Sequence, residues 1–425
     1  MNILLIGSGG REHAFSYYLN KSKLCSHLYI MPGNAGTAEC GANVSINPLH
    51  FDKVAEFCIE KNIELILVGP EEPLVKGMRN YFESNEEIKH IKFVGPDQAG
   101  AAMEGSKDWS KAFMSKYNVP TATYKTFTAE NLQEGLAYVK QHSLPIVLKA
   151  DGLAAGKGVL ICQTHAEAEA ELEQMISQSK FGDASKKVVV EAFLDGIELS
   201  VFVLCDGNSY KILPSAKDYK RIGEGDTGLN TGGMGAISPV PFADEQFMEK
   251  VESRIIKPTI EGLKQEGIKY VGFIFIGLMK VGDEPWVIEY NSRMGDPETE
   301  AVLPRIKTDI GELMLASAEG RLHEMQLEIS NQTAATVMLV SAGYPGDYAK
   351  GKVMTGFDDV NKSLVFHAGT KINANNEVET NGGRVLAITS LADNIKEAVA
   401  LSMKAAAKIN YDGKYFRKDI GYEFI

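Results

Sequence analysis

The sequence predicts an α/β domain with a doubly wound parallel sheet at the N-terminus, followed by α+β units built around antiparallel strands. Three observations lead to this prediction. Short apolar runs alternate with helical patterns over the first hundred residues. From residue 187 onward, β-rich runs are separated by Asp-Gly turns, which is typical of hairpins. The length of 425 residues exceeds one ordinary core and corresponds to about three domains.

In the N-terminal unit, each strand is expected to end in a turn rich in glycine or proline. The first strand ends in Gly7-Ser8-Gly9-Gly10, and the next two end in residues 32–36 and 69–73. Ligands of an open parallel sheet bind beyond the carboxyl ends of its strands, so these turns form the expected binding edge. The predicted elements are strands at residues 2–6, 28–31, 65–68 and 93–95 and a helix at 51–61.

The middle of the chain alternates helices with β-rich runs. Ser106 is a suitable cap for a helix that ends near residue 117. Residues 188–193 and 198–205 resemble a hairpin around Asp195-Gly196. Segment 216–239 is rich in glycine and lacks hydrophobic periodicity, so we expect a long functional loop. The remaining predicted strands are 145–150, 158–162, 270–279 and 286–290, and the remaining helices are 129–141, 166–178 and 245–265.

The last hundred residues are expected to form a further unit. Strands are predicted at residues 333–340 and 383–389, with a turn at 343–346 after the first. Asp393 is expected to cap a helix, because apolar residues then recur on one helical face. These residues are Ile395, Val399, Met403 and Ala406.

Composition restricts the partners and the compartment. The chain has 44 Lys and Arg against 56 Asp and Glu, a net charge of −12, which argues against a nucleic-acid or anionic-membrane surface. Five cysteines without a C-x-x-C pair predict neither a zinc site nor disulfides, but reduced thiols. The longest strongly apolar run, 270–279, is too short to span a bilayer, and no signal peptide is recognised. We therefore expect a soluble cytoplasmic protein.

Segment 147–159 predicts phosphate binding. A buried-type strand presents Lys149, and a loop rich in glycine and alanine presents Lys157 between Gly156 and Gly158. Small residues let backbone N–H groups approach phosphate oxygens, and the ammonium groups offset their charge. The segment is not a Walker motif, because Gly158 stands where Ser or Thr is required. The alternative is a glycine-rich hairpin with solvated lysines.

A candidate metal site lies on a later strand. Glu289 and Asn291 are two residues apart, so they share one face of a strand and offer the hard oxygen ligands that Mg²⁺ prefers. The alternative is an edge strand with its polar residues outward. The turn 293–300 follows directly, and its Arg293 can hold a carboxylate or phosphate in bidentate fashion. A solvated loop is the alternative there.

Two weaker patterns also concern nucleotides or phosphate. Glu191 and Glu198 flank a turn with an exposable backbone at Leu194, which could bind a nucleotide, although acidic hairpins are common. The turn before Arg11 fails the G-x-G-x-x-G pattern of dinucleotide sites, because Glu12 takes the third glycine position. A helix N-terminus with Arg11 nearby still suits a phosphate monoester, and a simple tight turn is the alternative.

Several segments together resemble one known family. The chain resembles the glycinamide ribonucleotide synthetases (phosphoribosylamine–glycine ligases), ATP-grasp enzymes of purine biosynthesis, over essentially its whole length. The segments that carry the resemblance are MNILLIGSGGREHA, PGNAGTA, VGPEEPLV, EGSK, VLKADGLAAGKGV, DYKRIGEGDTGLNTGGMGA, RMGDPETE, YPGDYAKG and NGGRVLAIT.

The resemblance implies four parts. They are an N-terminal Rossmann-like (pre-ATP-grasp) domain at 1–103, a helical segment with the ATP-grasp lid at 104–187, a central ATP-grasp catalytic domain at 188–328 and a mixed C-terminal domain at 329–425. A monomer or weak homodimer is expected.

The resemblance also implies the site residues. The catalytic residues would be Lys149, Arg293 and Asp296, and Mg²⁺ or Mn²⁺ would bind Glu289 and Asn291. The implied ATP contacts are Lys107, Lys149, Gly156, Lys157, Gly158, Glu191, Leu194 and Glu198. The implied substrate contacts are Gly9, Gly10, Arg11 and Arg293 for the phosphate of the amino sugar and Gly232, Gly233, Met234, Gly295 and Asp296 for glycine.

Three positions depart from the residues usual in the family. Met294 replaces Phe, Glu300 replaces Gln, and Tyr219 replaces His. Glu300 adds charge near the metal, so its role is left open and it is not counted as a ligand. The strand before Glu289 offers no second acidic ligand in residues 275–277, so the metal would depend on Glu289, Asn291 and nucleotide oxygens.

The implied reaction joins glycine to 5-phosphoribosylamine. ATP would convert the glycine carboxylate into glycyl phosphate, and the amine would then attack it, giving glycinamide ribonucleotide, ADP and phosphate. A sister ATP-grasp carboxylate–amine ligase is the nearest alternative. A nicotinamide-dependent oxidoreductase is disfavoured by the missing third glycine. A homologue that only senses nucleotide is disfavoured by the presence of Lys149, Glu289, Asn291 and Arg293.

Overall fold

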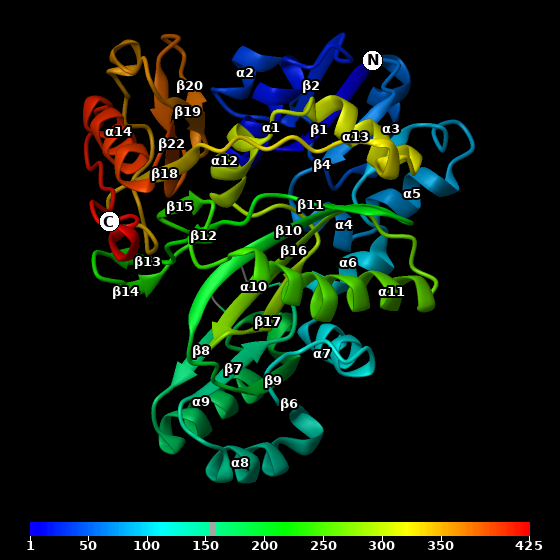
Figure 1. Ribbon diagram of the computed structural model, residues 1–425, viewed down its shortest axis with the longest axis vertical. Helices are drawn as coiled ribbons and strands as arrows, with labels where there is room; N and C mark the ends of the chain where they lie inside the picture. Colours follow the sequence, from blue (N-terminus) through cyan, green and yellow to red (C-terminus); the bar gives the residue numbers. More distant parts are fainter. Residues whose placement is uncertain (154–157) are drawn as a thin grey trace.

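Four structural parts make up the computed structural model, which describes residues 1–153 and 158–425. The N-terminal and C-terminal domains lie side by side at one end, the central sheet lies below them, and the lid forms the opposite end (Figure 1). Within the described residues, no helix has both the length and the apolar character needed to cross a membrane.

The N-terminal domain is a parallel sheet with helices on both faces, as predicted. Its strand order is β3-β2-β1-β4-β5. Alternate residues of β1 enter two cores: Ile3 packs with α1 and α13, whereas Leu4 packs with α3, α4 and α5. A strand covered on both faces must be apolar throughout, which explains its sequence. The elements are β1 Asn2–Gly7, α1 Gly10–Asn20, β2 His27–Pro32, α2 Thr37–Cys40, β3 Ala42–Asn43, α3 Phe51–Glu60, β4 Leu65–Val68, α4 Glu71–Val75, α5 Met78–Ser84, β5 Lys92–Val94 and α6 Gln98–Gly105.

The lid is a four-stranded antiparallel sheet, order β6-β9-β7-β8, that packs against α8 and α9. Helix α7 precedes it, and Ser106 caps α7 as predicted by accepting a hydrogen bond from the Trp109 amide. The expected domain border after residue 187 falls at the start of β9, a strand of the lid sheet. The elements are α7 Lys107–Lys116, β6 Tyr124–Thr128, α8 Leu132–Gln141, β7 Ile146–Ala150, β8 Val159–Cys162, α9 His165–Ser177 and β9 Lys187–Ala192.

The predicted hairpin around Asp195-Gly196 is wrong. Strand β9 pairs with β6 and β7 of the lid, whereas β10 pairs with β11 and β16 of the central sheet. The glycine is needed for a different reason. A Cβ on Gly196 would lie 2.2 Å from the Lys280 carbonyl oxygen, so only glycine allows this close approach to β16. The connection between the strands therefore joins the lid to the central domain.

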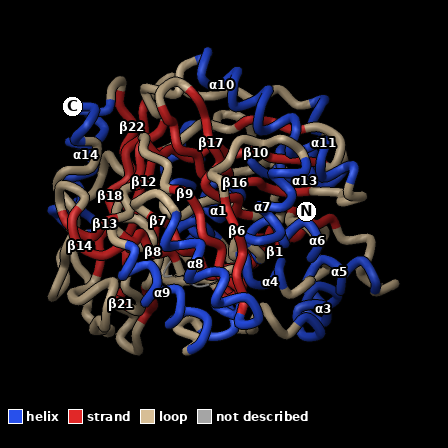
Figure 2. The backbone as a smooth tube through the Cα atoms, turned by 90° about the horizontal axis from the view of Figure 1, so that it is seen from below, coloured by secondary structure: helices blue, strands red, loops and turns tan. Residues whose placement is uncertain are grey.

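The central sheet is antiparallel, order β11-β10-β16-β17, and the view from the lid end shows β10, β16 and β17 side by side (Figure 2). One face packs on the helix formed by α10, a π-helical turn and α11, and the other on α13. The elements are β10 Ile197–Asp206, β11 Tyr210–Ile212, α10 Glu245–Val251, η3 Glu252–Ile256, α11 Lys257–Gln265, β16 Val271–Val281, β17 Glu284–Asn291, α12 Glu298–Val302 and α13 Ile310–Glu319.

Segment 216–239 is not the long loop that its glycines predicted. It contains four short strands, of which β13 and β14 form a hairpin and β15 joins the C-terminal sheet beside β18. Strands this short show no alternation of apolar and polar residues that could be recognised in the sequence. The partner of β15, strand β18, lies about a hundred residues later in the chain. The strands are β12 Lys217–Asp218, β13 Arg221–Gly223, β14 Thr227–Asn230 and β15 Gly235–Ser238.

The C-terminal domain is a sheet of order β12-β15-β18-β22-β19 with α14 packed on β18 and β22. The predicted cap at Asp393 is wrong by one residue, because the Asn394 side chain accepts the hydrogen bond from the Glu397 amide at 3.0 Å. The elements are β18 Thr333–Val340, β19 Leu364–His367, β20 Thr370–Ile372, β21 Val378–Thr380, β22 Arg384–Ala392 and α14 Ile395–Lys408. Single 3-10 turns occur at η1 Ala129–Asn131, η2 Gly182–Lys186, η4 Leu303–Arg305, η5 Leu322–Glu324, η6 Phe357–Asp359 and η7 Tyr422–Phe424.

Candidate active site

Lys149 and Glu191 form an ion pair on the inner face of the lid sheet. Strand β7 pairs with β9 so that Val147 lies opposite Glu191, which places Lys149 and Glu191 on the same face. The Lys149 Nζ lies 3.1 Å from Glu191 Oε1 and donates to the Ile288 carbonyl oxygen of β17 at 3.1 Å. Lys149 therefore links the lid to the strand that carries the candidate metal ligands.

A second buried lysine holds the other oxygen of Glu191. The Lys111 Nζ, on α7, lies 2.8 Å from Glu191 Oε2 and donates to Thr121 Oγ1 at 2.7 Å. Burial lowers the pKa of Lys111 to about 8, although Glu191 acts in the opposite direction. Lys111 was not predicted as a site residue, because a lysine on an amphipathic helix normally faces solvent.

Glu289 and Asn291 share one face of β17, as predicted from their spacing. The intervening Tyr290 is buried on the other face, where its hydroxyl lies 2.6 Å from Thr259 Oγ1. Burial opposes ionisation of Glu289, but four cations outweigh it and keep its pKa below the usual value. These cations are Lys220, Lys149, Lys107 and Arg293. An ionised carboxylate among several cations suits a metal ion that carries a polyphosphate.

Lys107 begins α7 beside the lid loop. Asp151 ties the two segments together, because it accepts from the Ser106 hydroxyl at 2.9 Å and from the Asp108 amide at 2.8 Å. The Lys107 Nζ lies 3.4 Å from the Gly152 carbonyl oxygen. Burial and the nearby Lys149 lower the pKa of Lys107, while Glu289 raises it.

The glycine-rich lid loop is only partly described. Gly158 is buried, and its carbonyl oxygen accepts from the Ala150 amide at 2.8 Å. The expected phosphate contacts at Gly156 and Lys157 lie outside the described residues.

The expected nucleotide residues Glu191, Leu194 and Glu198 span the connection between lid and central sheet. Leu194 is half-buried, and its amide has no acceptor among residues 1–153 and 158–425. Glu198, at the start of β10, forms an ion pair with Lys220 at 2.5 Å. In the chain, Leu194 stands between two carboxylates on different sheets, Glu191 on β9 and Glu198 on β10, and such a connection is suited to a heterocyclic base and a ribose.

Arg293 joins the central domain to the N-terminal domain. Its guanidinium lies 2.7 Å from Glu104 and 3.3 Å from Glu71. Glu104 is held in turn by the Ser292 amide at 2.8 Å. Arg293 therefore lies next to the candidate metal strand, but it does not line the cavity described next.

A cavity of about 350 Å³ lies where the N-terminal, central and C-terminal domains meet. Its wall includes Gly9 at the start of α1, Asn34 after β2, Asp296 in the turn before α12, and Ala368 and Arg384 from the C-terminal domain. Segments far apart in the sequence thus form one site. Gly9 and Asp296 were predicted, whereas Asn34 and Arg384 were missed.

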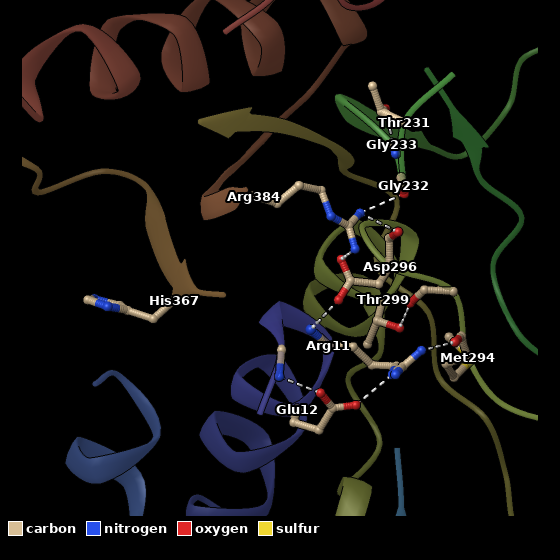
Figure 3. Close-up of polar contacts among 12 residues, drawn as sticks. Arg11, Glu12, Thr231, Gly232, Gly233, Met294, Asp296, Thr299, His367 and Arg384 are labelled. Atoms are coloured by element: carbon tan, nitrogen blue, oxygen red, sulfur yellow. Dashed lines mark hydrogen bonds and ion pairs between the residues drawn. The ribbon is translucent and has the colours of Figure 1, made fainter. Parts of the chain in front are cut away.

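Asp296 and Arg384 both line this cavity and are paired with each other (Figure 3). The Arg384 Nη2 lies 2.9 Å from Asp296 Oδ1, and its Nη1 donates to the Gly232 carbonyl oxygen at 2.6 Å. Burial opposes ionisation of Asp296, but Arg384 and Arg11 keep its pKa below the usual value. One signal for Arg384 existed in the sequence, because it follows two glycines in an otherwise apolar strand.

Arg11 contacts the wall residue Asp296 through its backbone amide and not through its side chain. Its amide donates to Asp296 Oδ2 at 3.3 Å, whereas its buried guanidinium lies 2.6 Å from Glu12 and donates to the Met294 carbonyl oxygen at 3.0 Å (Figure 3). Glu12 also accepts from the Gly9 amide at 2.6 Å. Gly10 and the Arg11 side chain do not line the cavity, so a ligand there would meet the N-terminus of α1 rather than this guanidinium.

The expected glycine-binding loop packs on the Asp296 turn. Gly233 has φ +116°, and a Cβ there would lie 2.4 Å from Pro297 Cδ, so only glycine fits. Gly232 accepts the Arg384 hydrogen bond and donates its amide to the Tyr344 hydroxyl at 2.9 Å. Met234 is fully buried, its amide donates to the Tyr219 carbonyl oxygen and its own carbonyl oxygen accepts from the Met338 amide, so this residue supports the loop from behind. A Cβ on Gly295 would lie 2.4 Å from Glu298.

The chain matches three models of phosphoribosylglycinamide synthetase: the N domain over residues 1–104, the ATP-grasp (A) domain over 105–299 and the C domain over 334–423. A Yersinia pestis protein named phosphoribosylamine–glycine ligase is 44% identical over 430 residues, covering 100% of this chain and 99% of that protein.

The chain belongs to the phosphoribosylglycinamide synthetase family.

Two solved structures are similar to this chain, and the first is itself a phosphoribosylamine–glycine ligase. The crystal structure of phosphoribosylamine–glycine ligase from Thermotoga maritima superposes with a TM-score of 0.85 at 33% identity, covering 99% of this chain and 100% of that one. The biotin carboxylase domain of the Hydrogenobacter thermophilus 2-oxoglutarate carboxylase, in complex with ADP and magnesium, gives a TM-score of 0.73 at 19% identity, covering 97% and 91%. This second likeness shows the fold alone.

Tyr219 and Met294, two of the three residues that differ from those usual in the family, have packing roles. The Tyr219 ring is buried, and its hydroxyl donates to Glu423 at 2.8 Å, so it joins β12 to the C-terminal segment. The Met294 side chain is buried in the core, and the carbonyl oxygen of this residue accepts from Arg11 and Arg293. Glu300 is the exception, because it is a fully buried acid whose two oxygens have no hydrogen-bond partner among the described residues.

The residues of the candidate site fit ATP and a divalent cation. Among the described residues, no three His, Cys, Asp or Glu side chains are arranged to hold a metal ion. Mg²⁺ often binds only one or two protein oxygens and completes its shell with phosphate and water. Glu289 and Asn291 supply two such oxygens, and the surrounding lysines offer counter-charges for a triphosphate.

Proposed function

We propose that this site ligates glycine to 5-phosphoribosylamine through glycyl phosphate, with ATP converted to ADP and phosphate. Members of this family are phosphoribosylamine–glycine ligases, which are ATP-dependent enzymes of purine biosynthesis, and the chain has this activity by its membership. One observation supports the mechanism most: a short segment runs from Glu289 and Asn291 on β17 to Asp296 in the cavity wall. This segment joins the candidate nucleotide site directly to the candidate substrate cavity.

ATP would bind between the lid and the central sheet. Lys107, Lys149 and the lid loop that includes Gly156–Gly158 would meet its phosphates, and the Leu194 amide with Glu191 and Glu198 would meet its base and ribose. Mg²⁺ or Mn²⁺, when bound to Glu289 and Asn291, would neutralise charge on the phosphates. The support is the ring of cations around Glu289 and the link from Lys149 to β17.

The amino sugar would place its phosphate in the cavity. Helix α1 begins at Gly10, directly after the wall residue Gly9, so the positive end of its dipole lies beside this space. Arg384 adds a guanidinium suited to a phosphate monoester. The carboxylate of Asp296, with the backbones of Gly232, Gly233 and Gly295, would hold the ammonium end of glycine nearby.

Positioning and charge neutralisation would account for the rate. A carboxylate is a poor electrophile, and phosphorylation gives it a good leaving group that the amine displaces. Lys149 would offset negative charge on the phosphoryl group during transfer. Arg293 would hold the turn before Asp296 in place through Glu71 and Glu104. Closure of the lid would exclude water, which hydrolyses acyl phosphates.

ADP release tests this proposal. ADP formation is measured with ATP, Mg²⁺ and glycine alone, with phosphoribosylamine alone, and with both. We expect sustained release only with both substrates, because the acyl phosphate is consumed only when the amine is present. Equal release with a different carboxylic acid in place of glycine would instead support a sister ligase.

A further inference from the structure

Glu300 lies directly behind the wall of the substrate cavity. It belongs to α12, and a Cβ placed on Gly10 would lie 2.3 Å from Glu300 Oε1 and 3.7 Å from the Cβ of Ala368. Ala368, Asp296 and Gly9 are themselves wall residues. The carboxyl group of Glu300 thus supports the site from behind without lining it.

No charged partner is left for Glu300. Its side chain is fully buried, and neither oxygen has a hydrogen-bond partner among the described residues. The charged groups that act on it are Asp296 in its own turn, Arg384 on β22 and Arg11 on α1. Arg384 is already paired with Asp296, and Arg11 with Glu12.

The other elements around α12 supply no counter-charge. Strands β15 and β18 contact α12 and carry no ionisable residue. Arg305 of the following turn donates to the Ser238 hydroxyl at 2.9 Å and to the Ser330 and Gln332 carbonyl oxygens. An ionised carboxylate without a partner in such a place is strongly unfavourable.

We propose that Glu300 is a neutral carboxylic acid and that its proton sustains the affinity of the cavity for a phosphate monoester. Burial and the adjacent Asp296 raise the pKa of Glu300 well above its ordinary value, in agreement with the geometry. If Glu300 ionised, its negative charge would compete with Asp296 for Arg384 and oppose the positive end of α1. Glu300 therefore acts as a positioning residue for the proposed function, on which this inference depends.

Binding of ribose 5-phosphate tests the inference on the full-length protein. Its affinity is measured by titration calorimetry between pH 7.5 and 10 for the wild type and Glu300→Gln, a neutral variant of the same shape. The phosphate is already a dianion in this range, so its own titration does not contribute. Glu173→Gln, an exposed acid on α9, is the control.

The two proteins should bind within about twofold of each other at pH 7.5, since both side chains are then neutral. The wild type should lose affinity at higher pH, by about tenfold per pH unit once Glu300 ionises, whereas Glu300→Gln should not. Equal affinities up to pH 10, or tighter binding by Glu300→Gln at pH 7.5, overturn the inference. Absence of wild-type binding at every pH would instead count against the proposed function.

A second measurement follows the proton itself. A buried acid that stays neutral in the fold but ionises on unfolding makes the protein less stable as pH rises above the ordinary pKa of Glu. Glu300→Gln should therefore melt at a higher temperature than the wild type at pH 8 and at about the same temperature near pH 4.5. An unchanged or lower melting temperature at pH 8 contradicts a neutral Glu300.

Discussion

Two lysines share the Glu191 carboxylate, which shows how single residues prepare the nucleotide site. Lys111 and Lys149 each bind one oxygen, and each also contacts a second segment, at Thr121 and Ile288. A buried carboxylate paired with two buried cations keeps one geometry. This arrangement fixes Lys149 before the nucleotide arrives.

Removing Lys111 should weaken ATP binding. In Lys111→Met, Glu191 keeps only Lys149, and the orientation of that pair is no longer fixed. We expect the KM for ATP to rise by about tenfold, since one charged hydrogen bond is worth about 1.5–3 kcal/mol, with a smaller change in kcat. Steady-state kinetics at saturating glycine would measure this. Lys116→Met, an exposed lysine of the same helix, should leave the KM unchanged.

Removing Glu289 should abolish turnover without unfolding the protein. In Glu289→Ala the proposed metal loses its only carboxylate, so we expect kcat to fall by about 10²–10³ or more, while the melting temperature changes little. ADP release and thermal unfolding give the two readouts. Glu284→Ala, at the exposed start of the same strand, is the matched control. Near wild-type kcat in Glu289→Ala would show that the metal site lies elsewhere.

Strand alternation allowed some of these residues to be predicted and others not. Glu289 and Asn291 lie on one strand, where their spacing alone places them on the same face, and Lys149 was predicted from its position before a glycine-rich loop. Lys111 and Arg384 could not be assigned, because their partners, Glu191 and Asp296, lie about eighty residues or more away in the chain. The unpaired state of Glu300 depends on three neighbours from three elements, which no local pattern reveals.

At the scale of elements, the C-terminal segment holds the β13–β14 hairpin. Arg417 is fully buried and forms ion pairs with Asp226 of the hairpin and with Asp419. Its Nη1 also donates to the Arg221 carbonyl oxygen. The same hairpin leads directly to the Gly232–Gly233 turn, so the C-terminal segment supports a substrate-binding loop.

Arg417→Met should therefore destabilise the protein and loosen the hairpin. Removing one member of a buried ion pair costs about 3–5 kcal/mol, and the lower end is expected because Asp226 is exposed and Asp419 is only partly buried. Urea unfolding would measure the loss, and limited proteolysis should show new cleavage within residues 223–230. In contrast, Lys418→Met, the exposed neighbouring residue, should unfold like the wild type.

The elements that the sequence failed to predict share a physical cause. Strands β12 to β15 are too short to show a recognisable alternation of apolar and polar residues. Strand β15 is also stabilised by β18, which lies about a hundred residues later in the chain. The Asp195-Gly196 pair was assigned to a hairpin turn. Its glycine is instead required because the backbone there lies too close to Lys280 of β16 for a side chain. Longer elements such as β1, β18 and α11 were predicted, because a strand buried on both faces is apolar throughout and a helix buried on one face has a periodic sequence.

At the scale of the whole molecule, the N-terminal and C-terminal domains meet at two buried histidines. The His367 amide donates to His13 Nδ1 at 2.7 Å, and the rings lie 5.5 Å apart. Burial lowers the pKa of His13 to about 3 and of His367 to about 4. Both are therefore neutral in the folded protein at physiological pH.

This contact should make the fold sensitive to acid. The unfolded chain takes up protons on these histidines near pH 6.5, whereas the folded protein does not until pH 3 to 4. Their contribution to stability is complete above pH 6.5 and falls below it, by up to about 1.4 kcal/mol per pH unit for each histidine. Urea unfolding at pH 7.5, 6 and 5 would measure the slope.

A variant isolates the histidine contribution. His367→Gln should show a shallower decline between pH 6.5 and 5 than the wild type. The exposed His90→Gln should show the wild-type slope. If His367→Gln and the wild type declined in parallel, the acid sensitivity would have to come from carboxylates instead.

The composition of the cavity wall has a consequence for protein synthesis. Gly9 leaves the ribosome early, Asp296 much later and Arg384 later still. Domains generally fold as units in the order of their synthesis. A nascent chain whose first domains are already compact thus still lacks the guanidinium that completes the pocket, and it acquires its affinity for the amino sugar only after β22 has been synthesised.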